Sequence, residues 1–464
     1  MEEKTSFRDS ISTVNDEGGR NWLYPKSPKG KFYNKRRTVS VLLLATLLIG
    51  PFIKVGEQPF FLFNLLERKF ILFGVVFWPQ DFSLFVLTII TAIVFIILFT
   101  VIFGRVWCGW VCPQTIFMEM VFRRIEYWIE GDARKQKKLN KQQWDVDKIG
   151  KKGLKFILFY LISFLIANVF LAYIIGSDAL LEIITDHPKN HVNGLVSIFV
   201  SSGVFCWVFA WFREQVCIIA CPYGRLQGVM IDKNTIVVAY DYLRGEKRGG
   251  LNKKEKSRTL GDCVDCNLCV EVCPTGIDIR NGTQLECVNC TACIDVCDNV
   301  MNKINFPEGL IRYTSEENIE KGDTKVFNNR VKAYSIVLLL LVSLLVFFMM
   351  SRSPIATTVL RAKGQIYQVH EETISNLYTF NLVNKTMFKA DVRFKLLSHK
   401  GKIQFIGADN IVVKQQDLYK GTMLIYLHTD QLKSPNEKLI IGVYKGDILI
   451  EEIETTFLVP NKKH

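Results

Sequence analysis

Eight of the thirteen cysteines form two runs with the same spacing, C-x2-C-x2-C-x3-C. Three thiolates at every third residue can wrap a tight loop around one face of an iron–sulfur cube, and the fourth cysteine of each run then binds the other cluster. The two predicted ligand sets are therefore Cys263, Cys266, Cys269 and Cys297 for one [4Fe–4S] cluster, and Cys287, Cys290, Cys293 and Cys273 for the other. Zinc ribbons instead separate C-x2-C pairs by long spacers. The spacing thus favours one-electron chemistry over a structural zinc site.

A second cysteine motif occurs twice, each time directly after a long apolar stretch. Each copy has an arginine followed by a C-x3-C-P sequence, and the two copies are Arg105, Cys108, Cys112 and Pro113, and Arg213, Cys217, Cys221 and Pro222. Residues four apart share one face of a helix, so each pair would present its two sulfurs together. The repetition predicts that two similar hairpins bring four thiols to one place.

The prolines and arginines of this motif bear on thiol chemistry. Proline disfavours a helical conformation for the residue before it and suits the first turn of a new helix, so Cys112 and Cys221 should lie at helix starts. The helix dipole and a neighbouring arginine would lower a thiol pKa there. Four soft thiolates would suit Cu(I), zinc or another iron–sulfur centre. The alternative is that these small side chains only permit close helix packing.

Other potential ligands are few. Cys206 lies alone in an apolar stretch, where packing is the simpler interpretation. Met118 and Met120 could offer thioether sulfurs near the first pair, but interfacial packing is the favoured interpretation. None of the six histidines lies within a predicted spanning helix, which disfavours bis-histidine haem ligation in the membrane. We expect His187 and His191 to be solvated loop residues.

The cysteine motifs are embedded in a chain with the composition of a membrane protein. Hydrophobic residues make up 49% of its 464 residues, and the mean hydropathy is +0.17. A spanning helix needs ~20 apolar residues, and five uncharged runs approach this length: residues 39–53, 82–103, 156–175, 192–212 and 333–350. Residues 58–80 have Glu67, Arg68 and Lys69 at their centre, so an interfacial or re-entrant hairpin is favoured there.

Lysine and arginine counts predict the orientation of these helices. Residues 105–153 have eleven, whereas residues 54–80 have three and residues 177–191 have one. We therefore expect a multi-pass protein of the inner (cytoplasmic) membrane, with the N-terminus and the eight-cysteine insert in the cytoplasm, where thiols stay reduced, and the C-terminus in the periplasm. The net charge of +13 is then a topology and membrane-surface signal, and nucleic acid is not an expected partner. Residues 1–16 are polar and have no signal-peptide pattern.

After residue 356, apolar and polar residues alternate in short runs, as is typical of β-strands. Expected strands cover residues 365–369, 374–383, 389–397, 402–406, 410–413, 422–428, 438–444 and 448–458, with turns at 399–401, 419–421 and 445–447. This density of short strands predicts an all-β sandwich of immunoglobulin-like architecture, although the Cys…Trp…Cys signature is absent.

The predicted fold class is an α-helical membrane protein with five transmembrane helices, a cytoplasmic bacterial-type two-cluster ferredoxin insert and a C-terminal immunoglobulin-like sandwich. The predicted divisions are a cytoplasmic N-terminal tail (1–38), a four-helix membrane part with both C-x3-C-P motifs (39–232), a cytoplasmic linker with the ferredoxin domain (233–332), a fifth transmembrane helix (333–352) and an extracytoplasmic sandwich (353–464).

This combination resembles the family of the cytochrome c oxidase accessory protein CcoG, also called FixG or RdxA. The resemblance rests on residues 105–116, 213–228 and 261–297 and covers nearly the whole chain, with Asp298 departing from the proline that follows the first run. It implies a role in assembly of cbb-type haem–copper oxidase, through an oxidoreductase (cupric reductase) activity that converts Cu(II) to Cu(I). The candidate copper-binding and catalytic residues are then Cys108, Cys112, Cys217 and Cys221. Implied partners are subunits of that oxidase, copper-handling proteins, membrane lipid and a cytoplasmic electron donor that the sequence does not identify.

Two other functions fit the same motifs. Related polyferredoxins with C-x3-C-P pairs resemble quinol-oxidising partners of periplasmic reductases, so the chain could be a quinol dehydrogenase subunit. It could also be a non-enzymatic redox-sensing scaffold, in which the sandwich holds oxidase subunits. Copper reduction by the purified protein separates the first function from the scaffold, and quinol-dependent cluster reduction identifies the dehydrogenase.

Overall fold

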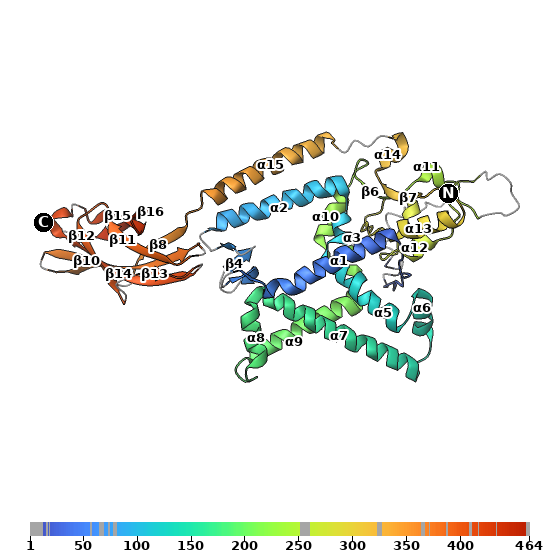
Figure 1. Cartoon of the computed structure of the whole chain (residues 1–464), viewed down its shortest axis with the longest axis horizontal. Coiled ribbons are helices and arrows are strands. Elements are labelled where there is room, and N and C mark those ends of the chain that lie inside the picture. The colour runs from blue at the N-terminus through green and yellow to red at the C-terminus, as the bar shows by residue number, and fades with distance from the viewer. Residues whose placement is uncertain are drawn as a thin grey trace. The chain divides into compact units, whose positions relative to one another are not determined.

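Figure 1 shows the computed structural model of the chain. It describes residues 13–14, 17, 19–55, 58–64, 69–72, 75–77, 81–250, 260–322, 327–362, 367–370, 372–386, 388–407, 411–415, 417–432 and 434–460. The chain forms two compact units. The first comprises Met1–Lys54, Pro59–Glu67 and Val86–Ser343, and the second comprises Val55–Gln58, Arg68–Phe85 and Leu344–His464.

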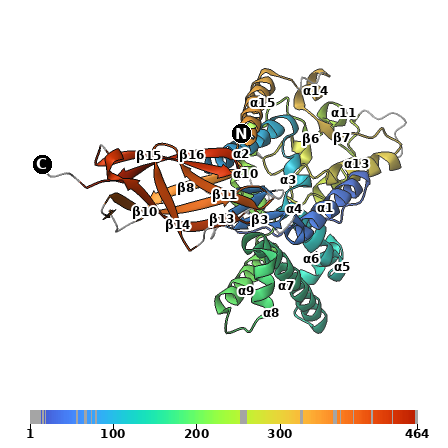
Figure 2. The same cartoon turned by 60° about the vertical axis from the view of Figure 1, so that its left-hand side comes forward.

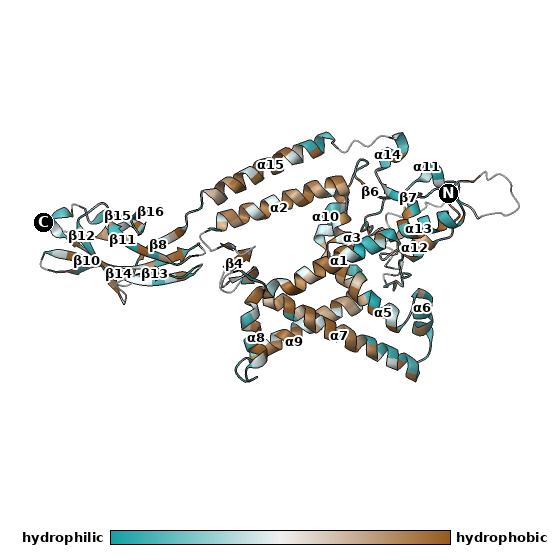
Figure 3. Ribbon diagram, in the orientation of Figure 1, coloured by the Kyte–Doolittle hydropathy of each residue, from teal (hydrophilic) through white to brown (hydrophobic). Residues whose placement is uncertain are grey.

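Four helices of the described residues are long and apolar enough to cross a membrane. They are α2 (Phe82–Phe103), α7 (Val146–Ile175), α9 (Val192–Trp207) with the π-helical turn η4 (Val208–Phe212) that extends it, and α15 (Asn329–Met350). Figure 3 shows hydrophobic colour along most of each of these helices. They coincide with four of the five predicted runs, except that α7 begins earlier, where the Asp145 carboxylate accepts a hydrogen bond from the Lys148 backbone N–H.

The first predicted span, residues 39–53, is not among these four helices. Helix α1 (Lys31–Ile49) begins within the basic N-terminal segment and is followed by the 3-10 turn η1 (Gly50–Phe52). The first part of α1 is therefore polar, and only its second part is apolar. The fifth transmembrane helix stays a prediction.

An aromatic core joins the segment after the first C-x3-C-P motif to α7 and α9. This segment consists of α4 (Pro113–Ile116), the π-helical turn η3 (Phe117–Phe122) and α5 (Arg123–Ile129). The Phe122 ring stacks on Phe209 with 4.4 Å between centroids and meets Phe159 edge-on at 4.8 Å. Cys206 is buried in the same cluster, so the prediction that it serves packing is confirmed.

Shorter elements complete the membrane-associated part. They are α3 (Val106–Trp110), α6 (Ala133–Lys141), α8 (Ser177–Thr185), the π-helical turn η5 (Val216–Ala220) and α10 (Pro222–Met230). Helix α8 packs through Leu180 against Ala172 and Ile198 of α7 and α9. Its turn into α9 contains His187 and His191, and the His191 ring lies 3.1 Å from the Asp186 carboxylate.

The eight-cysteine insert is closed by a two-stranded antiparallel sheet, β6 (Val237–Tyr240) with β7 (Ile311–Thr314). Between these strands lie α11 (Tyr242–Gly245), α12 (Leu268–Glu271), the 3-10 turn η6 (Ile279–Asn281) and α13 (Ala292–Lys303), and α14 (Glu316–Lys321) follows. Ile277, Ile294 and Met301 pack with both strands into a small core that also contains cysteines. The insert thus has its own core, which positions the cysteine loops.

Residues 54–77 form short strands: β1 (Lys54–Val55), β2 (Gln58–Pro59), β3 (Phe61–Asn64), β4 (Lys69–Leu72) and β5 (Val75–Phe77). Strands β4 and β5 pair antiparallel, and the interfacial or re-entrant hairpin predicted for residues 58–80 stays a prediction. Glu67 and Arg68, on which that prediction rested, lie outside the described residues.

The second unit contains two packed sheets, which Figure 2 shows clearly. One has the order β12 (Gly401–Ile406), β14 (Leu418–His428), β10 (Thr373–Asn384), β8 (Ile355–Arg361), with β9 (Gln368–Val369) also on β10; the other has the order β13 (Ile411–Val413), β11 (Ala390–Leu396), β15 (Asn436–Lys445), β16 (Ile448–Leu458). A 3-10 turn, η7 (Thr429–Gln431), follows β14. The inner faces of the two sheets bury one apolar core, so the predicted sandwich is confirmed.

Two details of the sandwich differ from the prediction. Strand β8 was not expected, and the predicted turn at residues 419–421 lies within β14. Gly421 pairs with Phe380 on β10, and a Cβ at Gly421 would lie 2.3 Å from the Phe380 ring. This glycine therefore makes room for an aromatic side chain and does not mark a turn.

A buried carboxylate joins two parts of the second unit. Asp81, which precedes α2, accepts from Arg352 at 2.5 Å and from Lys385 at 2.7 Å. Arg352 also donates to the backbone carbonyl of Val76. These contacts fix Val76 and Asp81 to residues that flank β8 and β10 of the sandwich.

Candidate iron–sulfur centres and membrane-edge cysteines

The first cysteine pocket is lined by the four cysteines that the crossed assignment groups together. They are Cys263, Cys266, Cys269 and Cys297. Asp265 and Asn267 have positive φ angles of 50° and 56°, which turn the loop tightly around the cavity. Arg280 holds this loop, because it donates to Asp265 at 2.5 Å and Asn267 at 2.6 Å. Cys297 comes from α13, as the second run requires.

The second cysteine pocket repeats this geometry. Its lining contains Cys273, Cys287, Cys290 and Cys293, together with Thr275 and Val288, and Cys269 of the first set also reaches it. Asn289 and Thr291 have positive φ angles of 53° and 67°, at the positions that match Asp265 and Asn267 of the first run. Each pocket thus has a four-thiol donor set suited to a [4Fe–4S] cluster.

No three histidine, cysteine or acidic side chains in the described part of the chain are placed to hold a single metal ion. A tetrahedral zinc ion would draw its thiolates together at bonds of about 2.3 Å, whereas an iron–sulfur cube holds them farther apart. The C-x2-C-x2-C-x3-C spacing of both runs favours cubes over the zinc alternative. Burial raises the pKa of Cys269, Cys287 and Cys297 to about 12, so only a bound metal centre would hold these ligands as thiolates.

The membrane-edge cysteines, by which we mean Cys108, Cys112, Cys217 and Cys221, lie where α2 and α9 end. Cys108 is in α3 and Cys217 is in the π-helical turn η5. Cys112 and Cys221 directly precede α4 and α10, as their prolines predict, and the Cys221 sulfur accepts from the Gly224 backbone N–H at 3.4 Å. Each pair is thus divided between two short helices and does not share one helix face as predicted.

The structure brings thiols of the two motif copies into one region. Cys112 and Cys221 both act electrostatically on Cys108, and Cys108 and Cys112 act on Cys217. The Cys108 sulfur donates to Gln227 Oε1 at 2.9 Å, and the Thr115 hydroxyl lies 4.0 Å from the Cys217 sulfur. The sequence gives no sign of this role for Gln227. Its side chain is buried, and its amide nitrogen donates a hydrogen bond to the Tyr223 hydroxyl.

Burial dominates the protonation of these thiols. It raises the pKa of Cys108 to about 11 and that of Cys217 to about 12, although Arg105 opposes both shifts. The sequence predicted such an arginine effect at Cys112 and Cys221. It acts here on the pKa of Cys108 and Cys217, where the effect of burial is larger. A metal ion that binds here would have to displace the thiol protons.

The first C-x3-C-P motif lies directly against the second cysteine pocket. A Cβ on Gly109 would stand 2.3 Å from the carbonyl oxygen of Val288, between Cys287 and Cys290. The Trp110 indole donates to the Tyr313 hydroxyl at 3.1 Å, and that hydroxyl donates to the Asn289 carbonyl at 3.2 Å. Only glycine permits this approach of two backbones.

A separate small cavity lies beside Cys217. Its wall contains Met118 from η3 and Pro274 and Thr275 from the insert, together with Glu119 and Glu214. Met118 and Met120 are also buried, and Met118 belongs to the apolar cluster of Phe117 and Phe122, as the packing interpretation expects. The cavity places one thioether near one of the membrane-edge thiols.

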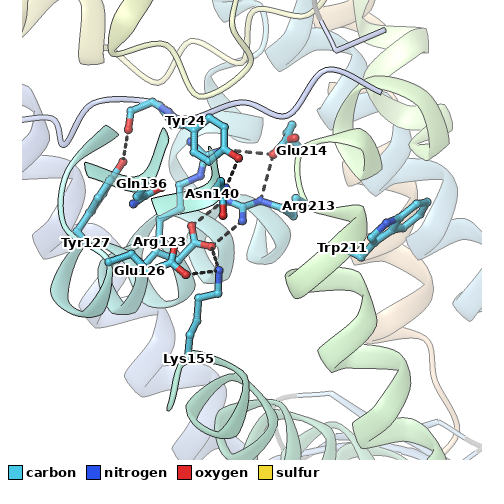
Figure 4. A network of polar contacts seen from close by, with 12 residues as sticks. Tyr24, Arg123, Glu126, Tyr127, Gln136, Asn140, Lys155, Trp211, Arg213 and Glu214 are labelled. Atoms are coloured by element: carbon cyan, nitrogen blue, oxygen red, sulfur yellow. Dashed lines mark hydrogen bonds and ion pairs between the residues drawn. The ribbon is translucent and has the colours of Figure 1, made fainter. Parts of the chain in front are cut away.

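A buried ionic network holds the second motif, as Figure 4 shows. Arg213 donates to both carboxylate oxygens of Glu126, at 2.7 and 2.8 Å, and both side chains are buried. Arg123 pairs with Glu119 and Glu214 at 3.2 Å. Arg213 has a φ of 54°, an uncommon conformation for a non-glycine residue. The sequence marks Arg213 through the repeat but gives no sign of its partner Glu126.

Three family models match parts of the chain. Residues 212–316 match a 4Fe-4S dicluster domain, residues 85–136 match a 4Fe-4S binding domain, and residues 345–460 match the IG-like fold at the C-terminal of FixG. A crystal structure of a FixG-related protein from Vibrio parahaemolyticus aligns with 23% of this chain and 97% of its own, at 22% identity and a TM-score of 0.20.

Several curated proteins are similar over greater lengths. Protein RdxA of Cereibacter sphaeroides is 35% identical over 393 residues, which is 81% of this chain and 81% of that protein. Protein RdxB of the same organism is 33% identical over 86% of this chain and 89% of its own length. Nitrogen fixation protein FixG of Rhizobium meliloti is 35% identical over 63% of this chain and 57% of its own. The chain is therefore a membrane iron–sulfur electron-transfer protein and belongs to the FixG/RdxA family.

Proposed function

We propose that this protein reduces Cu(II) to Cu(I) at its membrane-edge cysteines, and that it does so in the assembly of a cbb-type cytochrome c oxidase. The observation that carries the proposal is the contact of Gly109 with the Val288 carbonyl. It sets a thiol-rich site beside the second cysteine pocket. The family resemblance supplies the oxidase and the copper.

The two cysteine pockets supply the redox part of the proposal. Cys263, Cys266, Cys269 and Cys297 would hold one cluster, and Cys273, Cys287, Cys290 and Cys293 the other. When bound, [4Fe–4S] clusters supply electrons one at a time, which matches the single electron that separates Cu(II) from Cu(I). The chain contributes burial, fixed loop geometry and hydrogen bonds around the sulfurs, which tune such centres.

Copper enters this proposal as the substrate. Each Cu(II) ion takes up one electron and becomes Cu(I), and no bond of the chain is broken. Soft sulfur ligands favour Cu(I) over Cu(II), so Cys108, Cys112, Cys217 and Cys221 would retain the reduced ion, and Met118 lies beside Cys217 as a further soft donor. Since the four thiols are not gathered around one point, we expect them to close on copper when it binds.

The proposed placement follows the distribution of basic residues. The N-terminus and the insert would lie in the cytoplasm, where a donor not yet identified supplies electrons, and the sandwich would lie in the periplasm. Subunits of the oxidase and copper-handling proteins are the proposed partners.

The experiment compares two variants of the full-length protein, purified anaerobically in detergent. The double variant Cys108→Ser, Cys217→Ser removes two soft ligands outside the iron–sulfur runs, and Cys206→Ser is the control because this thiol is buried in an apolar core. Iron, bound copper and the rate of Cu(I) formation are measured together, with protein that has been reduced and then freed of the reductant before Cu(II) is added. We expect the double variant to keep its iron and lose copper binding and reduction, and the control to keep all three.

Each of the other outcomes would support a different role for these cysteines or for the protein. Unchanged copper reduction in the double variant would contradict the proposed site and leave these cysteines a packing role. A loss of iron would indicate that the membrane-edge cysteines hold a further iron–sulfur centre. Failure of the wild-type protein to reduce copper would favour the scaffold, and cluster reduction by a quinol would favour the dehydrogenase.

A further inference from the structure

Two buried arginines flank the second cysteine pocket on the side of the membrane-edge cysteines. Arg36 of α1 donates from Nε to the Gly109 carbonyl at 2.7 Å, and Gly109 abuts Val288. Arg105 donates to the carbonyl of Leu285, two residues before Cys287. The exposed fractions of Arg36 and Arg105 are only 2% and 3%. Both guanidinium groups thus lie at the junction of the first C-x3-C-P motif and the insert.

Several donors at this junction have no acceptor. Within the described residues, Arg36 Nη2, Arg105 Nε and Asn289 Nδ2 are buried and lack a hydrogen-bond partner. Buried N–H groups in folded proteins are almost always paired, because leaving them unpaired is costly. None of these three residues is part of the lining of the second cysteine pocket, and the Asn289 atom that meets a ligand is Oδ1, 3.5 Å from the Cys287 sulfur. What the two buried arginines offer the pocket is therefore their charge.

The charge environment of the two pockets also differs. Among the described residues, neither Arg36 nor Arg105 forms an ion pair. The positive charge of Arg36 acts on Cys290, and that of Arg105 acts on Cys287. Glu119 acts on Cys290 in the opposite sense, but it is paired with Arg123. Arg280, which lines the first pocket, is instead neutralised by Asp278 at 2.7 Å and Asp265 at 2.5 Å.

Access to solvent follows the same division. Cys266 in the first pocket is the one exposed residue among the chain's cysteines, all of which the structure describes. The second pocket instead faces Gly109 and the membrane-edge motif. A donor from solution would thus reach the first pocket more easily.

We propose that Arg36 and Arg105 are tuning residues of the second cysteine pocket: their two buried, uncompensated positive charges make the cluster held there easier to reduce than the cluster at the first pocket. Positive charge stabilises the more negative, reduced form. The consequence of this tuning rests on the proposed function: the electron would be held at the cluster next to the membrane-edge cysteines, where copper is reduced.

The test is a redox titration of the full-length protein followed by electron paramagnetic resonance, with iron content as the check that both clusters are present. Arg36→Gln should move the higher of the two midpoint potentials to a more negative value and leave the lower one in place. Arg37→Gln is the matched control, because this neighbour on α1 carries the same charge but is exposed, and it should move neither. Arg36→Lys keeps the charge, so its higher midpoint potential should lie between those of the wild-type protein and of Arg36→Gln.

If Arg36→Gln lost iron, Arg105→Gln compared with the exposed Arg225→Gln would give the same test at the other side of the pocket. Equal shifts of both potentials, a shift of the lower one alone, or the same effect from Arg37→Gln would overturn the inference. The titration uses no copper. A protein that fails to reduce copper but shows the selective shift would thus contradict the proposed function and support the tuning role.

Discussion

Replacing Glu126 with glutamine removes one carboxylate from the buried network around Arg213 and leaves the shape of the side chain almost unchanged. Glu126 accepts two hydrogen bonds from Arg213, which lies 87 residues away in the sequence. The side chains of Arg213 and Glu126 are only 3% and 4% exposed. The substitution would therefore leave a buried guanidinium, four residues before Cys217, without the carboxylate that it contacts most closely. The other carboxylate, Glu214, lies 3.6 Å from Arg213 Nε.

Two estimates of the cost agree. Removing one partner of a buried ion pair costs about 3–5 kcal/mol. Burial raises the pKa of Glu126, but the charge and hydrogen bonds of Arg213 outweigh burial and lower it to about 2 from the usual 4.5. A difference of this size corresponds to about 3 kcal/mol, since one pKa unit is worth about 1.4 kcal/mol.

The assay is thermal unfolding of the full-length protein in detergent, together with the rate at which a maleimide labels Cys217. We expect a lower midpoint and faster labelling, because the η5 turn loses its anchor. Asp147→Asn is the control: Asp147 forms an exposed pair with Lys151, at 2.7 Å, and such pairs contribute only about 0.2–1 kcal/mol. If Glu126→Gln and Asp147→Asn had the same effect, the anchoring role would be wrong.

The pH dependence follows from the direction of this shift. A carboxylate whose pKa is lowered by folding stabilises the folded state at every pH above its unfolded value, and this contribution disappears as the pH falls from about 4.5 through about 2. The difference in stability between the wild-type protein and Glu126→Gln should therefore stay constant across neutral pH. A difference that shrank between pH 8 and pH 6, both far above about 4.5 for an unfolded glutamate, would contradict this assignment.

Three further predictions concern contacts and topology. Gly109→Ala should destabilise the protein by about 1–3 kcal/mol in the same unfolding assay through overpacking against Val288, whereas Gly153→Ala, where a Cβ meets nothing within 4 Å, should not. Cys273→Ser should damage the cluster of Cys287, Cys290 and Cys293, and a resonance signal lost only from the other cluster would refute the crossed ligand sets. A phosphatase reporter fused after His464 should be active outside the cell membrane and one inserted beside Gly249 inactive, and the reverse pattern would exclude the predicted orientation.

Local spacing predicted much of the iron–sulfur insert. The two runs place cysteines, and residues with positive φ angles such as Asp265 and Asn289, at equivalent positions, because a tight loop around a four-thiol site needs the same backbone each time. The prolines after Cys112 and Cys221 also indicated the helix starts correctly. These features depend on residues a few positions apart, so the sequence displays them directly.

Contacts between distant segments could not be predicted in the same way. Nothing in the sequence pairs Gly109 with Val288 or Arg213 with Glu126, since these contacts arise only when the helices and the insert fold together. Gly421 was misinterpreted as a turn residue for a related reason, because its role is to accommodate Phe380 on a neighbouring strand. The length of α1 was also missed, since its polar first half hides its helical character from a search for apolar runs.

The central claim is that electrons held at the cysteine pockets reach copper at the membrane-edge cysteines. The most direct measurement is a single-turnover experiment, in which protein reduced anaerobically and freed of reductant is mixed with Cu(II) while iron–sulfur absorbance and Cu(I) formation are followed together. We predict that both signals change at the same rate, with one electron lost for each Cu(I) formed, and that Cys108→Ser, Cys217→Ser abolishes both changes. Clusters that remained reduced in the presence of Cu(II), or equal Cu(I) formation by the double variant, would contradict the claim.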